Sequence, residues 1–405
     1  MFRSHAFSLL AARTARCGIL AVALLYFGPS ACAAAPLAER LESAKVVREF
    51  STEGAEIYDV AVGKGLVAFV LWKEDTSVVV VYDHSGNEKF RYGGRDPDTA
   101  YHQLRTVDFS EDGGTLMITE VAGIESFRWK VFDLSGHLLF EIAPPYGTEV
   151  VASPSGQYFT FSNNFSPQNV LPIYDRAGRE IERFENLYPR WTCCFVDDEH
   201  LLVAARDTAR IIDVGSRRIT GVLPLNLPGQ GYAPAVALSR PQSVMAVYCS
   251  HLLVVLSAAG EELWRESYPD NLLLHAVLFS SDGPWMAMEF HSRDPEDFYY
   301  RVTSVRDRQR TVRSQTVAAL VKSLFRGSGN CGHFCDGMIT VPGQDGLRSA
   351  TVFLEFESGS RSLGQAAVVQ GQYLWFGGPP NGVRYLRATP KGPAQIVEVS
   401  AADGR

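Results

Sequence analysis

The chain has 405 residues, of which 46% are apolar and 20% charged, and its formal net charge is −7. This composition is that of a globular protein and excludes a disordered chain. The negative charge argues against a general nucleic-acid binder and against a protein attached to anionic membranes. The 35 glycines and 21 prolines, with few periodic runs of helical length, favour many short strands joined by turns.

The first 33 residues have the pattern of a secretory signal peptide. Three arginines and no acid precede an apolar run over residues 18–27, which is too short to span a bilayer. Ala31-Cys32-Ala33 then offers the small residues that signal peptidase recognises. We therefore expect cleavage after Ala33 and a periplasmic or secreted protein, with an uncleaved anchor and lipidation at Cys32 as alternatives. Loss of the three arginines takes the net charge to −10, and the mature chain contains no other candidate membrane span.

Export affects the interpretation of the cysteines. Two of the seven lie in the leader, and the other five are Cys193, Cys194, Cys249, Cys331 and Cys335. In an oxidising compartment, the spacing of the last two predicts a local disulfide that closes a small loop. Cys193 and Cys194 are neighbours on an expected strand, and either is a candidate to pair with Cys249 of the next repeat. The count is odd, so at least one thiol stays free or pairs with another chain.

A hairpin pattern recurs along the chain. An extended run leads to Asp or Ser, a glycine follows, and a second extended run comes next. The Asp or Ser side chain stabilises such a turn, and glycine supplies a positive φ. The turns begin at Asp83, Asp133, Asp175, Asp213 and Ser257, and in degraded form at Ser304, near Glu357 and at Ser400. Their mean spacing of about 45 residues suits a repeat of four strands.

A second kind of hairpin precedes these turns, for example in residues 107–118, 151–159 and 278–286. Each repeat therefore holds about four antiparallel strands. The number of turns favours eight blades, and seven if residues 314–336 replace a blade. Residues 45–50 resemble the fourth strand of the other repeats, so we expect the N-terminal strand to complete the last blade and close the ring.

These hairpins carry a family resemblance. Ser110-Glu111-Asp112-Gly113 resembles the S-x-D-G half-units of β-propellers of the WD-repeat-like and TolB type, and residues 257–264 approximate the D-x-x-G-x-x-x-W turn of quinoprotein repeats. The likeness covers residues 44–313 well and 314–405 poorly. It implies a single all-β propeller domain over residues 34–405. The chain departs from the family pattern at 314–336, where Ser314 is a candidate cap of a short helix, and we expect a decorated connection between the sixth and seventh repeats. It says little about function, because propellers support many unrelated activities.

The connections between repeats contain the candidate binding residues. In a propeller these connections surround one mouth of the central channel, and five of them here carry a tyrosine close to Pro or Gly. Aromatic rings give a large contact area, and their hydroxyls can orient a ligand. The alternative is that these tyrosines pack between blades. The candidate ligand-binding residues are Tyr101, His102, Arg105, Tyr146, Tyr188, Arg190, Trp191, Tyr232, Tyr268 and His275.

No catalytic or metal-binding motif stands out in the sequence. G-x-S-x-G, H-E-x-x-H and G-x-x-x-x-G-K-[ST] do not occur. We therefore expect an exported, non-catalytic propeller without a cofactor, which binds an envelope protein, peptide or glycan at the channel mouth. The alternative is an exported enzyme similar to quinoprotein dehydrogenases, with pyrroloquinoline quinone and calcium as cofactors. The neighbours Cys193 and Cys194 favour this alternative. Against it, Trp264 alone among the repeats occupies the tryptophan position of the quinoprotein motif. The sequence does not indicate the oligomeric state.

Overall fold

A computed structural model describes residues 37–400 apart from 64, 94–101, 123–126, 144–147, 164–169, 186–190, 206–207, 226–233, 250, 280–284, 293–297, 306–310, 315–333, 336–337, 342–349, 357–362, 371, 378–381 and 389–391. The expected signal peptide and most of the decorated connection at 314–336 lie outside these residues. The described part contains one short helix, α1 (Leu37–Glu42), and 32 strands. The chain is therefore all-β, as the turn pattern predicts.

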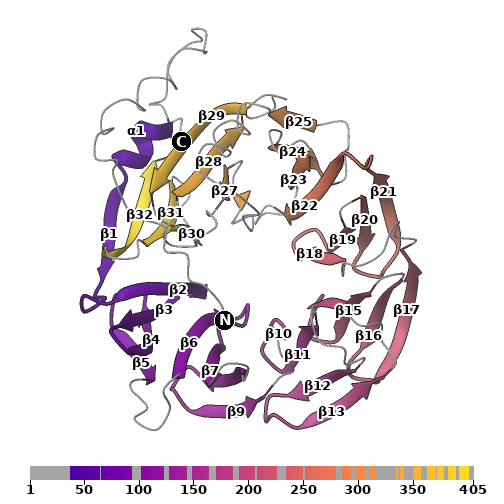
Figure 1. Cartoon of the computed structure of the whole chain (residues 1–405), viewed down its shortest axis with the longest axis horizontal. Helices are drawn as coiled ribbons and strands as arrows, with labels where there is room; N and C mark the ends of the chain where they lie inside the picture. Colours follow the sequence, from indigo (N-terminus) through magenta and orange to yellow (C-terminus); the bar gives the residue numbers. More distant parts are fainter. Residues whose placement is uncertain are drawn as a thin grey trace, which may run out of the picture.

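The strands form antiparallel sheets in which neighbours in sequence are neighbours in space. Figure 1 shows these sheets around a central opening, with one edge strand of each group of four facing inward. Five sheets are β2 (Glu56–Gly63), β3 (Leu66–Lys73), β4 (Thr76–Asp83) and β5 (Glu88–Gly93); β6 (His102–Phe109), β7 (Thr115–Ala122), β8 (Phe127–Asp133) and β9 (Leu138–Ile142); β18 (Ala235–Ser239), β19 (Val244–Cys249), β20 (Leu252–Ser257) and β21 (Glu262–Ser267); β22 (Leu272–Phe279), β23 (Trp285–Ser292), β24 (Phe298–Ser304) and β25 (Thr311–Ser314); and β26 (Phe334–Cys335), β27 (Met338–Val341), β28 (Ala350–Phe356) and β29 (Leu363–Gln370).

One sheet of eight strands consists of two such four-stranded units. In the described part of the chain, the strand pairing between the two units is limited to Asn163↔Trp191, which joins β11 to β14. The first unit is β10 (Thr148–Ala152), β11 (Tyr158–Asn163), β12 (Leu171–Asp175) and β13 (Glu180–Phe184), and the second is β14 (Trp191–Phe195), β15 (His200–Ala205), β16 (Thr208–Asp213) and β17 (Arg218–Pro224).

The last sheet combines strands from the two ends of the chain. It contains β30 (Gln372–Gly377), β31 (Gly382–Ala388), β32 (Ala394–Ser400) and the N-terminal strand β1 (Lys45–Phe50). β1 runs antiparallel to β32 from Lys45↔Glu398 to Phe50↔Ala394, and Figure 1 shows the indigo strand beside the yellow one. The expected pairing of the N-terminal strand with the last strand is thereby confirmed.

The core lies between the faces of adjacent sheets. Alternate residues of β3 show this, because Val67 and Phe69 pack toward the last sheet while Ala68 and Val70 pack toward the sheet of β6 to β9. All four are 0% exposed, so β3 is buried on both faces. An apolar run without polar alternation is what a strand in this position requires, and each side chain buried this way contributes about 1.5–3 kcal/mol.

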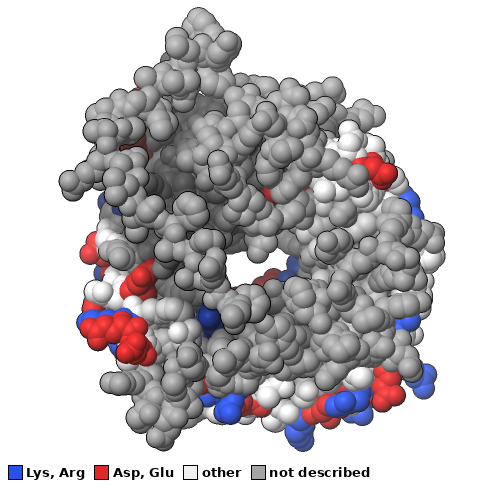
Figure 2. All heavy atoms as spheres, viewed as in Figure 1, with Lys and Arg blue, Asp and Glu red and all other residues white. Residues whose placement is uncertain are grey.

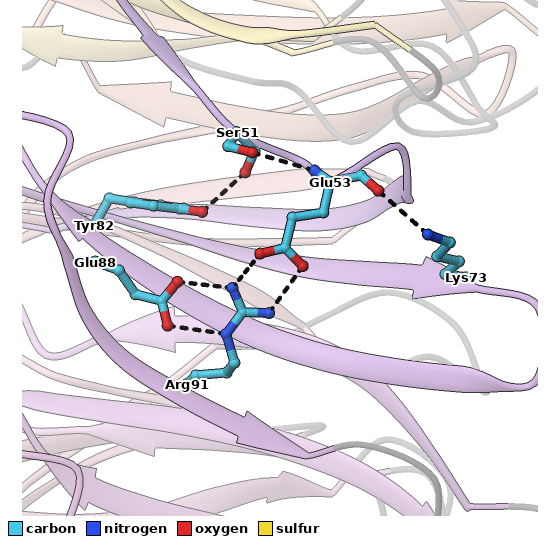
Figure 3. A network of polar contacts seen from close by, with 6 residues as sticks. All are labelled: Ser51, Glu53, Lys73, Tyr82, Glu88 and Arg91. Atoms are coloured by element: carbon cyan, nitrogen blue, oxygen red, sulfur yellow. Dashed lines mark hydrogen bonds and ion pairs between the residues drawn. The ribbon is translucent and has the colours of Figure 1, made fainter.

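A network of polar contacts fixes the passage from β1 into β2 (Figure 3). Arg91 of β5 lies between two carboxylates: its Nη2 is 2.6 Å from Glu53 Oε1 and 2.7 Å from Glu88 Oε2. The Tyr82 hydroxyl donates to the Ser51 carbonyl at 2.9 Å. The connection that leaves the last sheet is therefore tied to the third and fourth strands of the next one, which supports the pairing of β1 with β32.

Candidate functional site

Three innermost strands carry a β-bulge at the same position. The strand pairing skips one residue between Ile57 and Asp59 in β2, between Leu104 and Thr106 in β6, and between Leu274 and Ala276 in β22. The bulged residues are Tyr58, Arg105 and His275. In each strand a buried aliphatic residue precedes the bulge, and a buried valine follows two residues after it. Bulges re-aim side chains and are frequent at barrel rims and binding sites.

Two of these bulged residues meet in a cluster with Trp72, which we call the mouth cluster (Tyr58, Trp72 and Arg105). The Tyr58 and Trp72 rings are stacked, with centroids 4.1 Å apart and an interplanar angle of 3°. The Arg105 guanidinium lies 5.7 Å from the Tyr58 centroid and 5.8 Å from the Trp72 centroid, and its Nη1 donates to the Tyr58 hydroxyl at 2.9 Å. Tyr58 is 38% exposed and Arg105 is also exposed, so the cluster faces solvent.

The neighbouring sheet holds the backbone of β6 around this bulge. Trp72 Nε1 donates to the Leu104 carbonyl at 2.9 Å, and the Leu104 N–H donates to Ser77 Oγ at 2.9 Å. The Val107 N–H donates to Asp59 Oδ2 at 3.0 Å. Within the described residues, β6 pairs with a strand on one side only, so these bonds satisfy N–H and carbonyl groups that an open edge would leave unpaired. The cluster is therefore organised without a ligand.

Two carboxyl groups lie on the same pair of strands. Burial raises the pKa of Asp59 to about 6, opposed by the hydrogen bonds from Val107 and Val60 and reinforced by the charge of Asp108. The pKa of Asp108 is also raised, because protein atoms crowd its carboxylate although water reaches part of its surface. Asp59 follows Tyr58 directly, and Asp108 comes three residues after Arg105. The two carboxyl groups therefore give this part of the channel wall a charge that depends on pH.

The mouth cluster lies on one face of the ring. The turns between the first and second strands of the sheets lie on the opposite face. The turn between β2 and β3 contacts the turn between β4 and β5 through the His84 N–H and the Gly65 carbonyl, 2.9 Å apart. Tyr58 near the start of β2 and Trp72 near the end of β3 lie at the other end of that sheet. Figure 2 shows that the molecule is hollowed at its centre, with basic and acidic atoms visible inside the opening.

The structure divides the sequence-predicted binding residues into three groups. Arg105 is exposed and belongs to the mouth cluster. Trp191 is 0% exposed and Tyr268 is 8% exposed, so both pack in apolar clusters; the Tyr268 hydroxyl accepts a hydrogen bond from Arg301 at 3.0 Å. For Tyr268 the packing alternative therefore holds. His102 and His275 lie on β6 and β22, and five predicted residues fall outside the described ones: Tyr101, Tyr146, Tyr188, Arg190 and Tyr232.

The sequence analysis did not single out Tyr58, Trp72, Asp59 or Asp108. A signal was present in the innermost strands, because Ile-Tyr-Asp-Val, Leu-Arg-Thr-Val and Leu-His-Ala-Val share an apolar residue and a valine at the same spacing. Alignment of these three segments by their valines would have placed Tyr58, Arg105 and His275 at one position.

Cys193, Cys194 and Cys249 lie on two neighbouring units, on strands β14 and β19. The Cys193 thiol donates to the Phe161 carbonyl at 3.6 Å, whereas Cys194 points to the opposite side of β14. Cys194 and Cys249 are free thiols that pack against the same apolar cluster. Burial raises the pKa of Cys194 to about 12 and that of Cys249 in the same direction. Pairing of these thiols under oxidising conditions stays a prediction, as does the disulfide between Cys335 and Cys331, which lies outside the described residues.

The described part of the chain holds neither a candidate metal cluster nor a candidate membrane-spanning helix. It contains no group of three or more His, Cys, Asp or Glu side chains that could hold a metal ion. In the same residues, no helix is long and apolar enough to cross a membrane.

Solved structures of other proteins share this fold. Sqt1 of Saccharomyces cerevisiae aligns with a TM-score of 0.59 and 12% identity over 89% of this chain and 100% of its own. Hsv2 of Kluyvelomyces marxianus aligns with a TM-score of 0.51 and 11% identity over 78% of this chain and 99% of its own. No family model and no curated protein matches the sequence. The fold is therefore that of a WD-repeat-like β-propeller, and identities this low carry no further conclusion.

Proposed function

We propose that this chain is an exported, non-catalytic propeller that binds a protein or peptide partner at the channel mouth. The observation that supports this function most is the mouth cluster, in which an exposed pair of stacked rings and a guanidinium lie on two adjacent innermost strands. Tyr, Trp and Arg are the residues that most often dominate protein interfaces. The proposal requires no cofactor.

Export is part of the proposal and rests on the sequence of residues 1–33. The basic leader, the short apolar run and the small residues before position 34 agree with a cleaved signal peptide. Intact-mass measurement of the protein purified from the envelope fraction tests it, with a mass that begins at residue 34 as the expected result. Recovery of the full-length chain from the cytosol would contradict export.

The preorganised backbone of the cluster also supports binding. The hydrogen bonds from Trp72, Leu104 and Val107 fix the bulge before any partner arrives. Side chains fixed in this way lose little conformational entropy on binding, so their contacts contribute more to affinity.

The test is capture of partners from an envelope extract by the immobilised protein. We expect Tyr58→Ala and Arg105→Ala to lose the proteins that the wild type retains. The matched control is Arg218→Ala, which removes an exposed arginine from the outer strand β17 and should retain all of them. Thermal unfolding of each variant checks that the fold is intact. If the wild type and all three variants retain the same partners, binding at the mouth is refuted. If the immobilised wild type retains only polysaccharide, the partner is a glycan and not a protein.

A further inference from the structure

The charge of the mouth cluster indicates which group of the partner it contacts. Arg105 is exposed, and no carboxylate within the described part of the chain forms an ion pair with it. Two arginines of the outer strands, by contrast, are neutralised: Arg91 of β5 lies against two glutamates, and Arg265 of β21 lies 2.5 Å from a third. Arg105 instead rests against two ring faces, which hold a guanidinium in place without cancelling its charge.

The geometry of Arg105 leaves hydrogen-bond donors available. Its Nη1 donates to the Tyr58 hydroxyl, and this is the polar side-chain contact that the described residues give it. A guanidinium has five N–H donors in a planar fork, so donors remain for a ligand. That fork matches the two oxygens of a carboxylate, and such bidentate pairs are among the strongest hydrogen bonds in proteins.

The backbone places a third residue at the same level of the channel wall. His275 occupies in β22 the bulged position that Tyr58 and Arg105 occupy in β2 and β6. The three positions belong to three different sheets around the ring (Figure 1). A residue type that can carry a positive charge therefore recurs at two of the three bulges.

We infer that the mouth cluster binds a carboxylate of an acidic peptide segment, with Arg105 as the residue that pairs with it and the Tyr58–Trp72 stack as its support. This inference rests on the proposed function and names the chemistry of the partner at that same site. The chain carries a net charge of −7, which repels acidic proteins at long range. Recognition of a carboxylate here must therefore come from short-range contacts with a local segment.

The test uses an array of octapeptides printed in pairs, in which one member contains Asp or Glu and the other contains Asn or Gln at the same positions. We expect the wild-type protein to bind the acidic members about tenfold or more tightly than their amide partners. Arg105→Gln should abolish this preference, and Arg105→Lys should weaken it because the fork is lost. Arg218→Gln is the matched control, and it should bind as the wild type does.

Three outcomes would overturn the inference. The first is an equal signal from the acidic and the amide peptides, including no signal from either. The second is a preference for acidic peptides that Arg105→Gln preserves. The third is binding of oligogalacturonate, spotted on the same array, without binding of acidic peptides. Failure here leaves the proposed function standing if Tyr58→Ala still loses the captured envelope proteins. If that variant also retains them, both conclusions fail.

Discussion

Glu111 and Arg240 form an ion pair although they belong to sheets that are not neighbours in the ring. Glu111 lies in the turn between β6 and β7, and Arg240 lies in the turn between β18 and β19. The units β10–β13 and β14–β17 lie between these two sheets along the chain (Figure 1). Arg240 also donates to the Phe195 carbonyl at 2.9 Å, so a single side chain links three sheets at the end of the ring opposite the mouth.

The turns between the first and second strands of the intervening units are also joined by hydrogen bonds. The Asp112 N–H donates to the Pro154 carbonyl at 2.9 Å, and the Ser155 N–H donates to Asp198 Oδ1 at 2.9 Å. With the contacts of Arg240, the first turns of four consecutive units form a closed circuit. Such a circuit restrains the inner rim of the ring, where the described innermost strands β6 and β18 each pair with a strand on one side only.

Substitutions at the two ends of this ion pair should differ in effect. Glu111 is 52% exposed, so Glu111→Gln should lower the free energy of unfolding by less than about 1 kcal/mol. Arg240→Met also removes the hydrogen bond to Phe195, so the loss should reach about 1–3 kcal/mol. Urea unfolding of the two variants measures the difference. In about 1 M salt the effect of Glu111→Gln should shrink further, whereas equal losses for both variants would contradict this account.

Gly178 should resist substitution more strongly than Gly54. Both have a positive φ, +74° and +72°, which costs about 1 kcal/mol for a residue with a Cβ. A Cβ on Gly178 would also lie 2.4 Å from Phe140 Cβ on the preceding sheet, whereas Gly54 has open space within 4 Å. We expect Gly178→Ala to lower the free energy of unfolding by about 1–3 kcal/mol more than Gly54→Ala does, because the new Cβ overpacks against Phe140. Urea midpoints compare the two variants, and equal losses would mean that Phe140 moves away freely.

The turns between third and fourth strands could be predicted from the sequence because their chemistry is local. Strands β4, β8 and β12 end at Asp83, Asp133 and Asp175, as the repeat pattern predicts. In each case the Oδ1 atom accepts hydrogen bonds from the N–H groups two and four residues later, at 2.9–3.0 Å. An Asp followed by a glycine that takes a positive φ is enough to specify such a turn.

The mouth cluster could not be predicted in the same way. Tyr58 and Trp72 are ordinary residues of two expected strands, and they stack because a bulge shifts the pairing between them by one residue. A bulge depends on how a strand packs against the next sheet, here through Asp59 and the Val107 N–H, and no residue type marks it within one segment. The burial of Tyr268 and its hydrogen bond from Arg301 could not be predicted for a related reason, because both depend on how β21, β23 and β24 pack together.

The buried ion pair between Lys130 and Glu120 should matter far more than ion pairs on the surface. Lys130 Nζ is 2.7 Å from Glu120 Oε2, and Glu120 is 1% exposed. Lys130→Met removes the ammonium group from beside a buried carboxylate, which should cost about 3–5 kcal/mol of stability. The double variant Glu120→Gln/Lys130→Met should recover most of this loss. Arg183→Met is the control because its pair with Glu180 is exposed, and it should leave the urea midpoint unchanged.

An outcome that contradicts this prediction is a loss in the double variant as large as that in Lys130→Met. It would show that the packing of the lysine stem, rather than the loss of the ammonium group beside the Glu120 carboxylate, accounts for the effect. Lys130 also donates to the Tyr92 hydroxyl at 2.6 Å, so Tyr92→Phe measures that contribution separately.

Replacement of Asp59 by Asn should stabilise the protein at neutral pH. The pKa of Asp59 is raised from 3.8 to about 6, so between these values the native state binds more protons than the unfolded state. Stability from this group therefore falls as the pH rises from about 4 to 6, and the penalty is complete at pH 7. Asp59→Asn removes the penalty and keeps an oxygen for the Val107 N–H, so we expect a gain of about 1–3 kcal/mol at pH 7.

Urea unfolding between pH 4 and pH 7 measures this gain, with Asp75→Asn in an exposed turn as the control. Parallel pH profiles for the wild type and Asp59→Asn would show that the carboxyl group ionises as freely in the folded chain as in the unfolded one.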